Sequence, residues 1–191
     1  MRKSIILLLA LLSITACQRN TFHIEGIAEG FTDGDTLFLM KDLNTQIPTD
    51  TILVKEGAFE LSGEADTTLL SLLYVQKNPE LNTTLFLEPG TIDIVMSHEE
   101  GQSVIGGTPA NIALQEANDI AITYGKKMEE LTQLATTPDI TQALGLNIAE
   151  QLKQLQSDMI KRIQELAERN RDNAFGQFIH SHLENDTISI P

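Results

Sequence analysis

Few side chains in this sequence have a type and spacing that suit metal binding. His180 and His182 form the closest histidine pair, but two residues apart on a helix they point about 200° away from each other, which does not suit one shared metal ion. We therefore interpret both as surface histidines. Residues 33–35, Asp-Gly-Asp, supply two oxygens of a calcium loop but lack its further ligands and its distal glutamate. This segment is predicted to be a turn.

Groups that could catalyse a reaction are equally isolated. Four carboxylates lie in one region without the paired spacing of acid–base catalysis: Glu88, Asp93, Glu99 and Glu100. Residues 106–109, Gly-Gly-Thr-Pro, lack the lysine and spacing of a phosphate-binding loop, and no serine lies in a nucleophile elbow. The single cysteine, Cys17, leaves no Cys-x-x-Cys pair and no thiolate zinc site. The sequence predicts no enzymatic activity, no cofactor and no metal.

The N-terminus carries a different chemical signal. Two basic residues precede the apolar segment 5–12, which is too short to span a bilayer, and small residues then lead to Cys17. This order resembles the lipobox of bacterial lipoproteins, which implies cleavage before Cys17 and acylation of its thiol. Residues 1–16 are predicted to be a signal peptide and residues 17–21 a lipidated tether. The alternative is an ordinary secretory signal with an incidental cysteine.

Charge and the residues after the cysteine indicate a location. Gln18 rather than aspartate follows Cys17, and residues 18–21 lack an acidic export cluster, which favours an outer-membrane anchor with the domain facing the periplasm. The chain has 27 acidic and 13 basic residues, a net charge of −14. Such a charge repels nucleic acid and anionic lipid. Nucleic acid is therefore excluded as a partner, and only the lipid anchor is expected to hold the protein at the membrane. Solubility alone explains the charge equally well.

An Asp-Thr dipeptide followed by an apolar residue or a second threonine recurs along the chain. It resembles the O-glycosylation sequence of periplasmic Bacteroidota proteins, which implies modification at four threonines: Thr36, Thr51, Thr67 and Thr187. The alternative interpretation is turn chemistry, because aspartate and threonine both hydrogen-bond the backbone at strand entries.

Residues 22–107 have the pattern of an antiparallel β domain. Alternating apolar residues and turn signals every 8–12 residues or so favour a sandwich or an open barrel. Residues 50–63 are predicted to form one hairpin around Gly57, and residues 83–96 a second around Glu88-Pro89-Gly90. The nearly continuous apolar run at 69–76 is typical of a strand covered on both faces.

Residues 108–191 change to a helical period. Thr108 or Asn111 can cap a helix that has Pro109 in its first turn. Apolar residues at steps of three and four form one stripe before Pro138 and a second after it, so we expect two long helices packed as an antiparallel hairpin. Two i,i+4 ion pairs are expected on the second helix, Asp158 with Arg162 and Glu165 with Arg169. The predicted fold class is α+β.

Three motifs carry a resemblance to a known family: D-T-I-x-V-x-x-G-x-F-x-x-x-G at 50–63, L-F-L-E-P-G-x-I-x-I at 85–94, and T-P-A-N at 108–111. They resemble a domain of unknown function in Bacteroidota lipoproteins that usually precedes a thioredoxin-like thiol-disulfide oxidoreductase domain. The resemblance implies no catalytic residue for these segments. The chain ends at Pro191, where such a redox domain is expected to begin.

These observations leave three functions open. The first is a lipid-anchored, non-enzymatic envelope module that docks a protein. The second is an accessory component of a thiol-disulfide redox system that acts with a separate thioredoxin-like protein. The third is a small-ligand carrier that uses the mouth of the β domain. An exposed apolar stripe on the helices favours the first, and an enclosed apolar cavity favours the third. The sequence leaves the oligomeric state undetermined.

Overall fold

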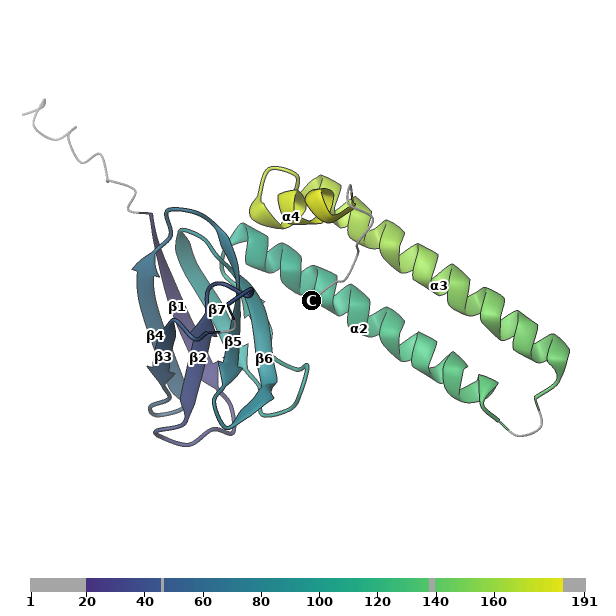
Figure 1. Cartoon of the computed structure of the whole chain (residues 1–191), viewed down its shortest axis with the longest axis horizontal. Helices are drawn as coiled ribbons and strands as arrows, with labels where there is room; N and C mark the ends of the chain where they lie inside the picture. The colour runs from purple at the N-terminus through teal and green to yellow at the C-terminus, as the bar shows by residue number, and fades with distance from the viewer. Residues whose placement is uncertain (1–19, 46, 138–139, 184–191) are drawn as a thin grey trace, which may run out of the picture.

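The computed structural model describes residues 20–45, 47–137 and 140–183. These residues form eight strands followed by three helices (Figure 1). In chain order they are β1 (Thr21–Ala28), β2 (Thr36–Met40), β3 (Asp50–Leu53), β4 (Ala58–Glu64), β5 (Leu69–Val75), β6 (Asn78–Leu87), β7 (Gly90–Met96), β8 (Val104–Gly106), α2 (Pro109–Ala135), α3 (Gln142–Arg169) and α4 (Ala174–Leu183).

The strands form two sheets that pack face to face. One sheet has the order β4-β1-β7-β8 and the other β3-β2-β5-β6. All neighbours are antiparallel except β1 and β7, which run parallel. Neither sheet closes on itself, so the structure confirms the α+β class as an open sandwich followed by a helical hairpin.

The core lies between the sheets because each strand turns alternate side chains inward. On β1, Phe22, Ile24 and Ala28 are buried, whereas Glu25 and Ile27 are exposed. The buried cluster continues into the start of α2, the end of α3, and α4, through Ala113, Leu166 and Phe175 among others. One continuous core therefore joins the sandwich to the helices.

The prediction of a hairpin at residues 50–63 is wrong, although its turn is correct. Lys55 and Ala58 exchange both backbone hydrogen bonds at 2.9 and 3.0 Å, around Glu56 (φ 53°) and Gly57 (φ 72°). Beyond this turn β3 pairs with β2, and β4 pairs with β1 in the other sheet. The segment crosses between the sheets because each strand has its own apolar side to bury in the shared core.

The predicted hairpin at residues 83–96 is wrong for the same reason, because β6 and β7 belong to opposite sheets. In this region β6 instead forms a tight hairpin with β5, which turns at Gln76-Lys77. The expectation that the run at 69–76 is covered on both faces is also wrong. Ser71, Leu73 and Val75 on one face are buried, whereas Leu70, Leu72 and Tyr74 on the other face are only half-buried.

The helices form the predicted antiparallel hairpin, and α4 packs back onto α2 and α3. Figure 1 shows α2 and α3 extending side by side away from the sandwich, with their connection at the far end. The predicted ion pairs on α3 are not the ones that form. Arg169 reaches across to Glu116 on α2 (2.7 Å), and Glu165 lies 3.9 Å from Lys161. No helix in the described part of the chain is both long and apolar enough to cross a bilayer.

Candidate functional site

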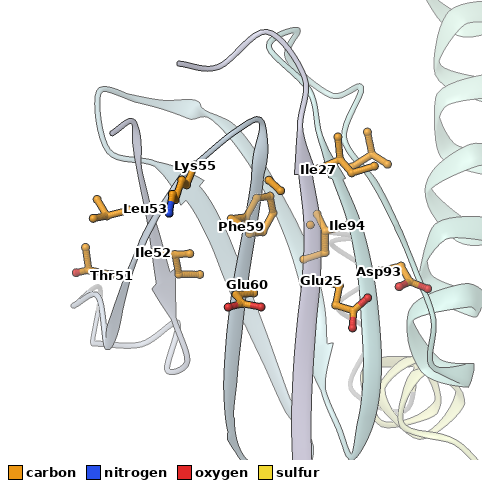
Figure 2. Close-up of a pocket in the computed structure, with 13 residues that line it drawn as sticks. Glu25, Ile27, Thr51, Ile52, Leu53, Lys55, Phe59, Glu60, Asp93 and Ile94 are labelled. Carbon is orange, nitrogen blue, oxygen red and sulfur yellow. The ribbon is translucent and has the colours of Figure 1, made fainter. Parts of the chain in front are cut away.

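A cleft of about 1010 Å³ lies beside the point where β3 and β4 separate after their tight turn. Figure 2 shows Ile52 and Phe59 facing each other across it, with Lys55 at its closed end and Leu53 pointing away. The Phe59 ring lies over Gly26, where a Cβ atom would come 2.0 Å from the ring. Gly26 therefore makes room for the aromatic wall. The cleft is an open groove rather than an enclosed cavity.

Three carboxylates that line this cleft lie side by side on the outer face of the sheet. The strand register places Glu25 directly opposite Glu60 on one side and Asp93 on the other, and all three residues are exposed. The four strands of this sheet contain no lysine or arginine. Like charges opposite each other across strands destabilise a sheet. The carboxylate row therefore concentrates negative charge on this face at a cost to the stability of the sheet.

An apolar row crosses the same sheet beside the carboxylates. The register aligns Ala58, Ile27, Val95 and Val104 across the four strands. Ile27 is 55% exposed and Val104 46% exposed. The outer face thus offers hydrophobic contacts next to negative charge. Among the described residues, no group of three His, Cys, Asp or Glu side chains is arranged to hold a metal ion.

His23 on β1 lies close to two other polar side chains. Its Nδ1 lies 2.6 Å from the Ser62 hydroxyl, and its Nε2 lies 3.1 Å from Glu25 Oε1. A serine, a histidine and a carboxylate in series are the groups of a hydrolase triad, but here all three lie on the outer face of the sheet, with Ser62 and Glu25 exposed to solvent. The histidine instead links β1 to β4.

The motifs at 85–94 and 108–111 meet in a joint between the sandwich and α2. The Asn111 side chain accepts a hydrogen bond from the Phe86 backbone N–H and donates to the Phe86 carbonyl, both at 2.8 Å. Its amide nitrogen also donates to the Thr108 hydroxyl at 2.8 Å. The Glu88 carboxylate accepts from the Ala110 N–H at 3.0 Å, where the helix dipole favours negative charge. These residues fasten the helix to the sheet.

The predicted modification sites differ in accessibility. Thr51 on β3 and Thr67 before β5 are exposed, whereas Thr36 at the start of β2 is half-buried. Cys17 and Thr187 lie outside the described residues.

The aspartates that precede two of these threonines have structural partners. Lys77 donates a hydrogen bond to Asp35 at 2.9 Å, and with the Thr32 backbone and hydroxyl groups it lowers the Asp35 pKa to about 2. The Asp50 carboxylate lies 2.8 Å from Lys41 Nζ, a charge contact without hydrogen-bond geometry. These contacts agree with the turn interpretation and leave the modification a prediction.

Sequence reasoning missed the cleft and the carboxylate row. Alternation along each strand marks Glu25, Glu60 and Asp93 as outward-facing, but only the register makes them neighbours. Likewise, the sequence predicted that β3 and β4 pair with each other, so no groove was expected between them.

The structure is an open two-sheet sandwich, and the residues of the joint fasten it to a projecting helical hairpin. Residues 22–114 match the family model described as a domain of unknown function, DUF4369. The match extends from β1 into α2 and includes all three motifs that carried the resemblance. Comparisons with curated proteins and with solved structures found no match.

Proposed function

We propose that this protein is a lipid-anchored, non-enzymatic module of the cell envelope that docks a protein partner through the tip of its helical hairpin. The observation that carries this proposal is the apolar surface of the tip. Leu134 at the end of α2, and Leu144 and Leu146 at the start of α3, are 54%, 50% and 67% exposed. Large apolar side chains that stay exposed in one region of a fold can mark an interaction site.

The tip is also poor in charge, in contrast to the rest of the molecule. Between residues 131 and 149 the sequence contains a single charged residue, Asp139, although the chain as a whole has a net charge of −14. Depletion of charge is characteristic of the centre of a protein interface. Full burial of a leucine contributes ~1.5–3 kcal/mol, so these leucines would supply part of the binding energy, and further contacts with the partner would offset the cost of association.

The shape of the molecule supports a tethered presentation of this tip. Figure 1 places the start of β1 and the connection between α2 and α3 at opposite ends of the molecule. The 27 residues of α2 extend about 40 Å at 1.5 Å per residue. If Cys17 is acylated, the few residues between it and Thr21 keep β1 within roughly 15 Å of the membrane. The hairpin tip is then free to reach a partner away from the bilayer.

A ligand carrier is less well supported, because the cleft beside β4 is open rather than enclosed. An accessory role in thiol-disulfide exchange is compatible with docking, since the partner could be a thioredoxin-like protein. The identity of the docked partner distinguishes general docking from this redox role.

Site-specific photo-crosslinking in native membranes tests the proposal. A photo-reactive amino acid at Leu146 is expected to give one discrete adduct with another protein. The same amino acid at Gln156, which is exposed in the middle of α3, is the matched control and is expected to give none. The double variant Leu134→Ser/Leu144→Ser should abolish the Leu146 adduct, and Cys17→Ala should weaken it by releasing the protein from the membrane. Equal labelling at both positions, or no adduct at Leu146 in acylated protein, contradicts docking by the tip.

A further inference from the structure

We propose that the free edge of β4 binds an extended peptide with alternating basic and apolar side chains, which adds as a fifth strand to the sheet β4-β1-β7-β8. This site uses different residues from the hairpin tip and goes beyond the docking function. The inference combines three observations: unpaired backbone groups, the neighbouring cleft and the carboxylate row.

The hydrogen-bond register shows which backbone groups of β4 are available. Ala28 N–H donates to Gly57 O (2.8 Å), and Ala65 N–H donates to Asn20 O (2.7 Å). Because hydrogen-bonded pairs alternate along an antiparallel ladder, Phe59, Leu61 and Gly63 bond to β1. Residues 60, 62 and 64 therefore direct their N–H and C=O groups to the free edge, where no strand of the described chain pairs with them.

The other sheet edges are less suitable for an added strand. Helix α2 packs against β8 and also contacts β6. The edge strand β3 has only four residues, whereas β4 has seven. Figure 2 shows β3 on the other side of the cleft from the β4 edge, and the two strands do not pair. A peptide of six to eight residues thus has one long unoccupied edge on which to pair.

The two faces of an added strand would meet different chemistry. Side chains that point inward would pack at the edge of the core, next to Ile52 and Phe59, which are both buried at 4% exposure. Side chains that point outward would lie beside Glu60 and Glu64, with Glu25 in the next strand. Basic residues at these outward positions would relieve the repulsion within the carboxylate row. The net charge of −14 would also attract a basic peptide from a distance.

A second copy of this chain does not fit the same edge. Antiparallel pairing of two β4 strands about Ser62 would place Glu60 of each copy opposite Glu64 of the other. Like charges in directly opposed positions are destabilising. The acidic edge therefore disfavours self-association while it accepts a strand of opposite charge.

The test uses fluorescence anisotropy of full-length protein in a non-ionic detergent, with a labelled eight-residue peptide of alternating lysine and valine. Two N-methylated versions of the peptide make the test specific for strand addition. One version is methylated on the backbone nitrogens of its four lysines, and the other on the backbone nitrogens of its four valines. Each version therefore lacks the backbone N–H donors on one edge of the peptide only. Strand addition predicts that one version loses binding and the other keeps it.

Protein variants test the charge component. Glu60→Lys/Glu64→Lys is expected to weaken peptide binding about tenfold or more, because attraction becomes repulsion. The matched control Glu129→Lys/Glu130→Lys makes the same change in net charge on the exposed face of α2 and should leave most of the affinity. Leu134→Ser/Leu144→Ser should have no effect on the peptide, which separates this site from the hairpin tip.

Amide hydrogen exchange provides an independent readout. Bound peptide should slow exchange at Glu60, Ser62 and Glu64, whose N–H groups face the edge, more than at the amides already bonded to β1. Absence of binding overturns the proposal. Equal affinity for both N-methylated peptides, or an equal loss in the two pairs of charge variants, also overturns it, because either result indicates non-specific attraction to an acidic protein.

Discussion

Asn111 shows how a single polar residue can determine the junction between two parts of a fold. It is fully buried and satisfies both backbone groups of Phe86 as well as the Thr108 hydroxyl. A buried polar group without a partner costs about 1–3 kcal/mol. Asn111 therefore contributes more to the stability of the fold than its small surface area suggests, because its loss leaves several buried polar groups unpaired.

We expect Asn111→Ala to lower the free energy of unfolding by about 3 kcal/mol or more, since it orphans the Phe86 N–H and C=O groups together. Urea denaturation followed by circular dichroism measures the change. Asn147→Ala, at an exposed position on α3, is the control and should change stability by less than about 0.5 kcal/mol. Similar small effects for both variants would contradict the buried bridge.

At the scale of the elements, the entry into α2 depends on close backbone approach. Gly107 adopts φ 84°, and a Cβ atom there would lie 2.2 Å from the Thr91 carbonyl oxygen on β7. At Gly125, in the interior of α2, an added methyl group would meet no atom within 4 Å. The two glycines are chemically identical, but only the first is required by its surroundings.

Alanine at these two glycines is expected to have opposite effects on stability. Gly107→Ala should destabilise by about 2 kcal/mol or more, from the steric clash together with the left-handed backbone. Gly125→Ala should stabilise by roughly 0.5–1 kcal/mol, because alanine is the better helix former. Thermal and urea unfolding of both variants checks the signs. A stabilising Gly107→Ala would disprove the close contact with β7.

Across the whole molecule, stability is unevenly distributed along the hairpin. Near the sandwich, Ala113 and Ala117 on α2 share the main core with Leu166. Towards the tip most apolar side chains are half-buried, and Ile148 is buried apart from that core. A segment with fewer buried contacts opens more readily, which suits a tip that must adapt to a partner.

Native-state hydrogen exchange should show this gradient. Amides at residues 114–120 of α2 are expected to exchange at least about tenfold more slowly than those at 129–134, because opening the proximal part disrupts the core. Ile148→Ala should speed exchange in the distal part alone, whereas its matched variant Ile163→Ala, in the main core, should speed it throughout. Uniform protection along α2 would show that the hairpin and sandwich open as one unit.

The sequence by itself determined the local structure. Period-two alternation predicted the β region, period-three-and-four stripes predicted the paired helices, and Gly57 marked a tight turn, because these features depend on neighbouring residues alone. The helix start at Pro109 was predictable for the same reason.

Only the tertiary structure decided which strands pair and which surfaces are free. Both predicted hairpins were wrong because a tight turn fixes the direction of the chain but not the sheet in which each strand finds its partner. The pairing of β1 with β4 and β7 brings together Glu25, Glu60 and Asp93 and leaves the β4 edge open. Long-range register of this kind is set by burial of the whole core, which no short stretch of residues encodes.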